Sequence, residues 1–338
     1  MTFPKLSIII PTLNAQKVLS ACLKSIKKQT FKKYQIIIAD GGSTDKTLQI
    51  ARKYNCKVIK NPLKTAEAGK MVALKKTSTK YVALIDSDNI LPTKDWLQNN
   101  IDILESNPKL VGTEPISFTY RPNAGFIERY SALIGANDPY AFVTGVYDRQ
   151  NHINYRWTGL KIDQIDKEKY IKIKLQPQKP IPTIGANGTI FRHSFLKPFL
   201  DTDYFFDIDI ISRHLQSSKR SIFFAKTKQG IIHTFCESSV KKFIKKQRRR
   251  IVDYFSYQKL RHFNWSQTNQ KSSLKFILYT LLILPMFIDM FIGFIHTPDP
   301  AWFFHPFACF ITLFIYSTST LKQKLGLLKG LDRNQWQQ

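Results

Sequence analysis

Short apolar runs alternate with helix-like segments throughout the first hundred residues, and this alternation constrains the fold more than any other feature. Runs of β-branched residues bounded by turn residues predict strands, and apolar residues at helical spacing predict helices. Strands alternating with helices predict an α/β fold, a doubly wound and mostly parallel sheet with helices on both faces. The predicted strands are residues 6–10, 35–39, 57–59 and 81–85, and the predicted helices are residues 15–29 and 69–77.

Polar clusters follow three of the predicted strands, at the point where each strand ends. They are Pro11–Asn14, Asp40–Asp45 and Asp86–Asp88. Because the carboxyl ends of parallel strands meet at one edge of a sheet, these clusters are expected to share a ligand site. Asp40 can accept hydrogen bonds from a base or a ribose there, and an Asx turn or a helix cap is the alternative.

Asp86 and Asp88 stand one residue apart, directly after the apolar run Tyr81–Ile85. In extended chain such carboxylates point the same way, which suits oxygen ligation of a hard divalent cation such as Mg²⁺ or Mn²⁺. A cation held there could in turn hold a diphosphate, whereas the alternative is a solvated turn. Lys70, behind Gly69 at a predicted helix start, either meets phosphate together with backbone donors or is a solvated side chain.

The chain is strongly basic, with 51 Lys and Arg residues against 24 Asp and Glu residues and a formal net charge of +27. Such an excess requires an anionic partner, either nucleic acid, a phosphorylated substrate or a membrane surface. Seven of the cations lie in residues 241–250, and apolar residues of Ser239–Tyr257 suit one helical face. This segment predicts an amphipathic helix on an anionic bilayer, with a nucleic-acid patch as the alternative. The four scattered cysteines favour a reducing, cytosolic environment.

Two apolar stretches near the C-terminus favour the membrane over nucleic acid, so no nucleic-acid partner is expected. Residues 274–295 are interrupted only by Lys275, Pro285 and Asp289, and residues 301–320 are almost free of ionisable side chains. Each stretch approaches the ~20 residues of a spanning helix, and the basic outer flanks place both ends in the cytosol. The prediction is a hairpin anchor in the cytoplasmic membrane, either fully spanning or, because Asp289 is costly at depth, re-entrant.

Five motifs, in this order and spacing, resemble the inverting family 2 glycosyltransferases of the GT-A fold. They are Ser7–Asn14, Ser25–Thr30, Ile38–Thr47, Gly69–Lys70 and Leu84–Asp88. The resemblance continues less tightly to about residue 251 and does not account for the C-terminal region. It implies a GT-A-type sheet, a nucleotide-sugar donor and a divalent cation.

On the donor side, the resemblance implies a role for each matching residue. The nucleotide would be held by Pro11, Thr12, Asn14 and Asp40, with Ser43 and Lys70 as weaker candidates. Asp86 and Asp88 would form the Asp-x-Asp metal pair, in which Asp88 is the more direct ligand of Mg²⁺ or Mn²⁺ and Asp86 lies nearer the ribose. The cation would neutralise charge as the nucleoside diphosphate leaves.

On the acceptor side, residues 184–192 resemble the family's Gly-rich loop, and Phe206–Arg213 is similar to the segment that carries its general base. The resemblance places that base at Asp207. Phe206 stands where the family usually carries an acid, which leaves Asp209 open as the alternative. Inversion at the anomeric carbon needs one base opposite the leaving group and no covalent intermediate.

Three further residues enter through the resemblance. His233 follows a short apolar run, as a histidine of the family that is often a third metal ligand does, although a solvated histidine is the alternative. Gln247 and Arg250 resemble part of the Gln-x-x-Arg-Trp motif of processive polysaccharide synthases, and they would touch the donor diphosphate or a lipid phosphate. Ile251 replaces the Trp, which argues against processive synthesis.

The sequence thus predicts a metal-dependent, inverting glycosyltransferase whose catalytic domain faces the cytosol and whose acceptor is a lipid or lipid-linked glycan of the cell envelope or surface. The alternatives are a polyprenyl-phosphate sugar synthase and a non-catalytic, membrane-bound binder of nucleotides or nucleic acid. The expected parts are a donor half in residues 1–110, an acceptor half in residues 111–235, a basic interfacial helix in residues 236–268, and the hairpin with its tail in residues 269–338.

Overall fold

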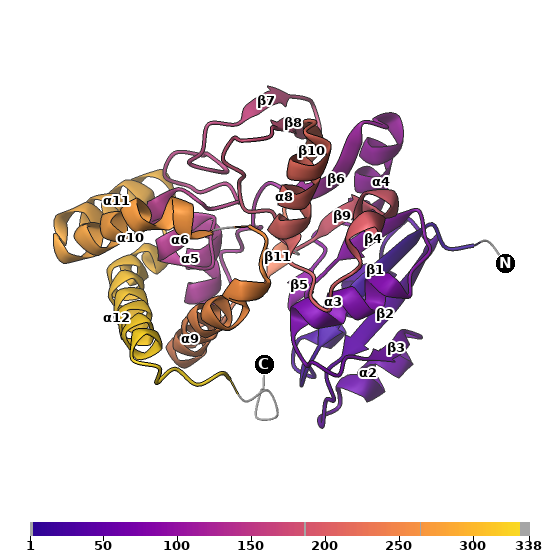
Figure 1. Cartoon of the computed structure of the whole chain (residues 1–338), viewed down its shortest axis with the longest axis horizontal. Helices are drawn as coiled ribbons and strands as arrows, with labels where there is room; N and C mark the ends of the chain where they lie inside the picture. The colour runs from indigo at the N-terminus through magenta and orange to yellow at the C-terminus, as the bar shows by residue number, and fades with distance from the viewer. Residues whose placement is uncertain (1–2, 186, 264, 332–338) are drawn as a thin grey trace. The chain divides into compact units, whose positions relative to one another are not determined.

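The computed structural model describes residues 3–185, 187–263 and 265–331, and it divides into two compact units. The first unit combines Met1–Ile116 with Ile162–His233, and the second combines Ser117–Lys161 with Thr234–Asp332. Each unit is therefore built from stretches that are distant in the sequence. The first holds the strands and the second is helical (Figure 1).

A nine-stranded sheet forms the centre of the first unit, in the order β3-β2-β1-β4-β9-β6-β10-β8-β7. The first four strands, β1 to β4, pair in parallel, as the sequence predicts. β9 lies antiparallel between β4 and β6. At the other edge β8 pairs antiparallel with β10, and β7 pairs antiparallel with β8, so the sheet is mixed. The strands are β1 Leu6–Thr12, β2 Tyr34–Asp40, β3 Lys57–Lys60, β4 Tyr81–Leu84, β6 Leu110–Pro115, β7 Asp163–Asp166, β8 Tyr170–Leu175, β9 Thr189–Arg192 and β10 Ile222–Thr227.

Every residue of β1 and β4 is buried, as expected of strands covered by helices on both faces. The helix predicted over residues 69–77 begins earlier, because the Thr65 side chain accepts a hydrogen bond from the Ala68 amide and caps it. The helix predicted over residues 15–29 is shorter at both ends. The helices of this unit are α1 Leu19–Lys27, α2 Thr47–Lys53, α3 Ala66–Lys75, α4 Trp96–Ser106, α7 His193–Leu196, η1 Lys197–Phe199 and α8 Asp207–Ser218.

A second, two-stranded sheet brings distant parts of the first unit together. β11 (Ile232–His233) pairs antiparallel with β5 (Asn89–Ile90), which follows the acidic loop after β4. In this register His233 lies opposite Asn89. The pairing therefore holds His233 beside Asp88, although the two residues are 145 positions apart in the sequence.

The second unit is a helical bundle with an aromatic core. Tyr130, Phe243, Phe276 and Trp302 are buried in one cluster with apolar residues from every long helix. The basic helix predicted over Ser239–Tyr257 is confirmed as α9. The helices are α5 Phe126–Ile134, α6 Pro139–Thr144, α9 Val240–Tyr257, η2 Gln258–Leu260, α10 Trp265–Leu281, α11 Leu284–His296, η3 Pro300–Phe303 and α12 Phe304–Lys324.

The apolar tail departs from the predicted pair of continuous segments. Pro300–Lys324 is long and apolar enough to cross a membrane, but residues 274–295 break after α10, and α11 leaves at an angle of 84°. Pro285 accounts for the break, because proline lacks an amide hydrogen and its ring clashes with the carbonyl four residues earlier. Ile283 at the corner has a positive φ of 63° with ψ −55°. The described tail thus has one candidate span, and a second only if the bent pair counts as one.

Candidate active site

Asp40, at the end of β2, is buried, and its carboxylate is fully engaged in hydrogen bonds. Oδ1 accepts from the hydroxyls of Thr12 at 2.9 Å and Ser43 at 2.6 Å. Oδ2 accepts from the amides of Gly42 at 2.9 Å and Ser43 at 2.8 Å. A carboxylate offers about four lone-pair positions. A ligand that donates to Asp40 must therefore take the place of one of the two hydroxyls.

The loops after β1 and β2 are bound to each other next to this carboxylate. The Asn14 amide donates to Ser43 Oγ, and Asn14 Oδ1 accepts from the Thr44 amide, both at 2.9 Å. Asn14 takes a left-handed backbone with φ 52°, a region in which asparagine is enriched. The structure thus brings Thr12, Asn14, Asp40 and Ser43 together at one edge of the sheet, as the sequence predicts.

Pro11 joins this edge through packing. The ideal position of a Cβ on Gly69 would lie 3.1 Å from Pro11 Cβ and 3.3 Å from Ala39 Cβ. Only a residue without a side chain lets α3 approach β1 and β2 this closely. Lys70, the next residue, is buried and is therefore not the solvated side chain of the alternative interpretation.

The loop between β4 and β5 carries the two aspartates. Asn89 is fully buried and shapes this loop, because its Oδ1 accepts from the Asp86 amide at 3.0 Å. Its Nδ2 donates to Asn187 Oδ1 at 3.0 Å, which ties the loop to the segment before β9. Asp88 lies on the side of the small sheet, where its Oδ2 comes within 3.4 Å of His233 Nε2.

The donors around Asp88 suit a divalent cation in kind. The Asp88 and His233 side chains are only 10% and 6% exposed, and a carboxylate oxygen with an imidazole nitrogen is a usual pair of ligands for Mn²⁺. Their separation is close to the roughly 3 Å between two atoms that each bind one ion at ~2.1 Å. Within the described residues, however, no three acidic, His or Cys side chains gather into a metal centre. Asp86 does not belong to the pair formed by Asp88 and His233.

Asp207 begins α8, and its carboxylate has two different surroundings. Oδ2 lies 3.9 Å from Lys70 Nζ. Oδ1 is buried and has no hydrogen-bond partner among the residues that the structure describes. Burial raises the pKa of Asp207 to about 7, and the nearby carboxylate of Asp86 adds to this shift, whereas Lys70 opposes it. A carboxylate whose pKa is near neutral, and which has one oxygen not engaged in a hydrogen bond, can accept a proton.

Asp209, the alternative base, is buried in the same helix two residues further on. Positions i and i+2 do not face each other on a helix, so Asp207 and Asp209 point in different directions. Asp207 Oδ2 lies 3.9 Å from Lys70 Nζ, a residue of the candidate site. The geometry thus favours Asp207, although the choice between the two stays a prediction.

A buried ion pair beneath this site was not predicted from the sequence. Lys226 Nζ and Glu114 Oε2 lie 2.7 Å apart, and both side chains are fully buried. Glu114 Oε1 accepts from the Gly185 amide at 2.9 Å and so holds the start of the segment before β9. The only signal in the sequence is one charged residue inside each of two apolar runs, and their pairing depends on β6 lying next to β10.

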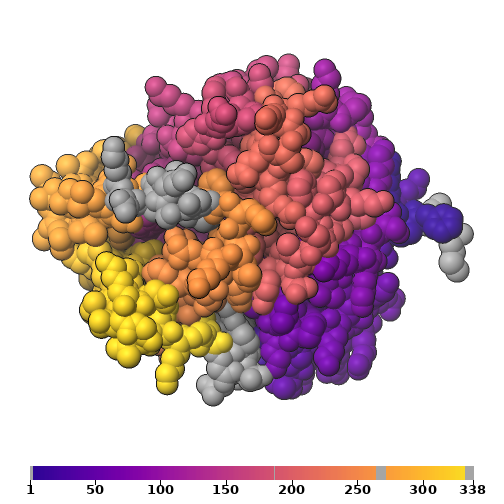
Figure 2. Space-filling view, in the orientation of Figure 1, coloured from indigo at the N-terminus to yellow at the C-terminus, as the bar shows by residue number. Residues whose placement is uncertain are grey.

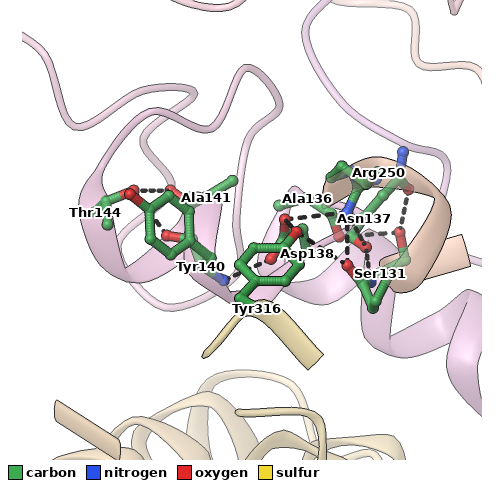
Figure 3. A network of polar contacts seen from close by, with 10 residues as sticks. Ser131, Ala136, Asn137, Asp138, Tyr140, Ala141, Thr144, Arg250 and Tyr316 are labelled. Atoms are coloured by element: carbon green, nitrogen blue, oxygen red, sulfur yellow. Dashed lines mark hydrogen bonds and ion pairs between the residues drawn. The ribbon is translucent and has the colours of Figure 1, made fainter. Parts of the chain in front are cut away.

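Gln247 and Arg250 lie in the second unit, inside a network around the start of α6. Figure 3 shows Arg250 in this network with Asn137 and Asp138. Gln247 Nε2 donates to the Asn137 carbonyl at 2.9 Å, and Arg250 Nη1 lies 3.1 Å from Asp138 Oδ2. Tyr316 donates its hydroxyl to the same Asp138 oxygen. Asp138 also caps α6 by accepting from the Tyr140 amide. The two residues are therefore structural here, and a contact with phosphate stays a prediction.

The sequence is similar to those of known glycosyltransferases. Residues 7–198, more than half of the chain, match the model of "Glycosyl transferase family 2". The glycosyltransferase AglE of Haloferax volcanii is 30% identical over 142 residues, 39% of this chain and 46% of AglE. The poly(ribitol-phosphate) beta-N-acetylglucosaminyltransferase TarS of Staphylococcus aureus is 38% identical over 95 residues, 26% of this chain and 17% of TarS. The chain thus matches less than half of each relative's length.

Among solved structures, the mannosyltransferase PcManGT from Pyrobaculum calidifontis, in complex with GDP-Man and Mn²⁺, is similar over 96% of this chain and 89% of its own. The TM-score is 0.51 and the sequence identity is 13%. At this identity the likeness speaks to the fold alone. It confirms the predicted GT-A architecture.

Proposed function

The chain belongs to glycosyl transferase family 2, and from this premise we propose that it transfers a sugar from a nucleoside-diphosphate donor to an acceptor hydroxyl, with inversion at the anomeric carbon. The observation that carries the proposal is the carboxylate of Asp207. It lies beside Lys70, its Oδ1 is buried and has no hydrogen-bond partner among the described residues, and its pKa is raised to about 7.

The nucleotide is proposed to bind at the edge formed by Pro11, Thr12, Asn14, Asp40 and Ser43. Support comes from their gathering at the carboxyl ends of parallel strands, where ligands of open α/β sheets bind. Hydroxyl rotation at Thr12 or Ser43 frees a lone pair on Asp40 for a base or ribose donor. The similar mannosyltransferase holds GDP-Man, which agrees with a nucleotide-sugar donor.

A divalent cation is proposed to bind at Asp88 and His233, with Asp86 turning toward it when the donor arrives. When bound, Mg²⁺ or Mn²⁺ supplies positive charge that stabilises the leaving diphosphate. Asp88 and His233 are already within 3.4 Å of each other, and the solved mannosyltransferase contains Mn²⁺. Asn89 and Asn187 hold the loop that presents the two aspartates.

Asp207 is proposed to accept the proton of the acceptor hydroxyl on Oδ1, as the acceptor oxygen attacks the anomeric carbon opposite the diphosphate. The sugar–phosphate bond breaks as the new glycosidic bond forms, and no covalent enzyme intermediate arises. Lys70 stabilises the ionised carboxylate of Asp207, and a direct contact of Lys70 with donor phosphate remains a separate proposal. A base with a pKa near the working pH is the most efficient one.

The acceptor is proposed to be a lipid or lipid-linked glycan presented at the cytoplasmic membrane. Seven cations in residues 241–250 and the apolar tail support this location. A polyprenyl-phosphate sugar synthase is the rival within the same chemistry, because its acceptor is the lipid phosphate itself. Product analysis separates the two, since an acid-labile sugar phosphodiester indicates the rival and an acid-stable glycoside indicates the main proposal.

Donor turnover by the Asp207→Asn and Asp209→Asn variants tests the proposed base. Purified protein is assayed with UDP-, GDP- and dTDP-sugars, Mn²⁺ and membrane lipid extract. Asp207→Asn is expected to lower kcat at least about a hundredfold with little change in donor KM, because general base catalysis typically contributes this much. Asp209→Asn, the matched control in the same helix, is expected to keep activity. Full turnover by Asp207→Asn would show that Asp207 is not the catalytic base.

A further inference from the structure

We propose that the apolar helices α10 to α12 enter one leaflet of an anionic bilayer from the side that holds the catalytic sheet, and that none of them crosses the membrane. This shallow insertion is independent of the proposed transfer reaction. It rests on contacts within the second unit and on the covalent reach of the chain.

The first observation concerns the connection between the two apolar segments. Asp299 in this connection is buried, with a side chain 4% exposed. It pairs with Arg129 Nε of α5 at 2.8 Å and accepts from the Tyr120 hydroxyl. Asp299 also caps η3 by accepting from the Ala301 amide. The connection is therefore fastened to α5 and to the loop before it.

That loop leads directly back to the sheet. β6 ends at Pro115, five residues before Tyr120. Five residues of extended chain reach at most about 18 Å, which is less than the ~30 Å thickness of a hydrocarbon core. A hairpin that crossed the bilayer would place its connection on the far side, where Tyr120 could not follow. The predicted fully spanning hairpin is therefore incompatible with these contacts.

The second observation concerns α12, which packs along the basic helix. Phe304 and Phe243 have ring centroids 5.3 Å apart, and the Tyr316 hydroxyl lies 3.3 Å from Gln247 Oε1. Residues 304–316 of α12 thus lie beside residues 243–250 of α9, which include Lys245, Lys246 and three arginines. A spanning α12 would carry these cations into the hydrocarbon, where charged side chains are strongly disfavoured.

The third observation is the surface that remains exposed, which we call the apolar face. At the corner between α10 and α11, Leu282 is 65% and Leu284 is 67% exposed. On α12 the exposed aromatic residues are spaced at helical intervals along one side. Figure 2 shows α12 in yellow and the neighbouring orange helices at the surface of the molecule. The apolar face comprises Leu281, Leu282, Ile283, Leu284, Phe287, Ile288, Phe291, Ile295, Phe303, Phe307, Phe310 and Phe314.

Charge complementarity identifies what covers the apolar face. Soluble proteins rarely expose apolar patches this large without a partner. On α9, Lys241, Lys245 and Arg248 are exposed at helical spacing, with Ile244 exposed among them. Exposed apolar residues on α10 to α12 and exposed cations on α9, the helix that packs against α12, fit a leaflet of anionic lipid. Its headgroups attract lysine and arginine, and its acyl chains accept the apolar side chains. A second copy of the chain would carry the same cations and would therefore repel this row.

Vesicle binding by the full chain tests the partner. Wild-type protein is expected to sediment with phosphatidylcholine vesicles that contain phosphatidylglycerol, and much less with phosphatidylcholine alone. Leu282→Asp with Leu284→Asp is expected to weaken binding at least about tenfold. Leu63→Asp, at an exposed leucine of the first unit, is the matched control and leaves binding unchanged. Thermal unfolding verifies that each variant folds.

Two results of this test would overturn the proposal. One is equal binding by the wild-type and Leu282→Asp/Leu284→Asp proteins. The other is absence of vesicle binding together with a dimer that the same variant dissociates, because the apolar face would then serve a second copy of the chain.

Cysteine labelling in cells tests the topology. Pro298→Cys places a thiol in the exposed connection, and Lys322→Cys places one near the end of α12. A membrane-impermeant maleimide is expected to label both in inverted membrane vesicles and neither in intact cells. Labelling of residue 298 in intact cells would show that the hairpin crosses, and would overturn the proposal. The parent chain, whose four cysteines give the background, is the control.

Discussion

At the residue scale, Asp207 is the side chain whose ionisation the fold controls most. Its pKa rises from an ordinary value of 3.8 to about 7, chiefly through burial. Between these two pH values the folded protein binds the proton and the unfolded chain does not. Stability contributed by the neutral acid is therefore complete below pH 3.8 and is lost as the pH rises through 7.

Asp207→Asn is accordingly expected to stabilise the protein above pH 7, by about 1–3 kcal/mol, because the variant never buries the charge. The gain should shrink as the pH falls toward 4. Urea unfolding of both proteins at several pH values measures it. A variant less stable than the wild type at pH 8 would show that Lys70 fully offsets the cost of burying the negative charge of Asp207.

The ion pair of Lys226 and Glu114 leads to a second prediction at this scale. Lys226→Met removes one charge of a fully buried ion pair and is expected to cost about 3–5 kcal/mol of unfolding free energy. Lys228→Met breaks an exposed pair with Asp166 in the same region and is expected to cost less than about 1 kcal/mol. Equal costs, measured by urea unfolding, would contradict the assignment.

Single residues also mark the limit of what the sequence predicts. The gathering of Thr12, Asn14, Asp40 and Ser43 follows from their places after predicted strands. The saturated hydrogen bonding of Asp40 does not, because it depends on the orientation of two hydroxyls. The contact of Lys70 with Asp207 joins residues far apart in the sequence, so only the folded chain reveals it.

At the scale of elements, the packing of α3 on β1 and β2 depends on Gly69. Gly→Ala in an exposed helix normally gains about 1 kcal/mol. Here the new Cβ would meet Asn61 Nδ2 at 2.9 Å, and that amide already donates to the Thr65 carbonyl. Gly69→Ala is therefore expected to lower stability by about 1–3 kcal/mol. A higher Tm for the variant would show that the residues around Pro11 shift easily to make room for the added methyl group.

The parallel strands were predictable because β-branched runs and the polar residues after them repeat with each strand. The insertion of β9 between β4 and β6 was not, since strand order is a property of the whole sheet. In the tail, an apolar composition predicted two segments of spanning length, but Pro285 and the positive φ of Ile283 divide the first one. Hydropathy alone does not register such a break.

At the scale of the whole molecule, both compact units are assembled from separate stretches of chain. The chain passes from one unit to the other near residues 116, 161 and 233. The composition changes near residues 116 and 233, whereas nothing in the sequence marks the passage near residue 161. The first unit carries the repeated order of strand, polar loop and helix that places the acidic groups. The second carries the cations of α9 and the apolar face.

The central claim is that acidic groups at the carboxyl ends of β2 and β4 gather a cation and a nucleoside diphosphate. Calorimetric titration of the full chain with UDP, GDP and dTDP, each with and without Mn²⁺, tests it most directly. At least one nucleotide is expected to bind, more tightly with Mn²⁺, and Asp88→Ala is expected to abolish the effect of Mn²⁺ while Asp207→Asn keeps it. Binding that neither responds to Mn²⁺ nor changes in Asp88→Ala would contradict the account.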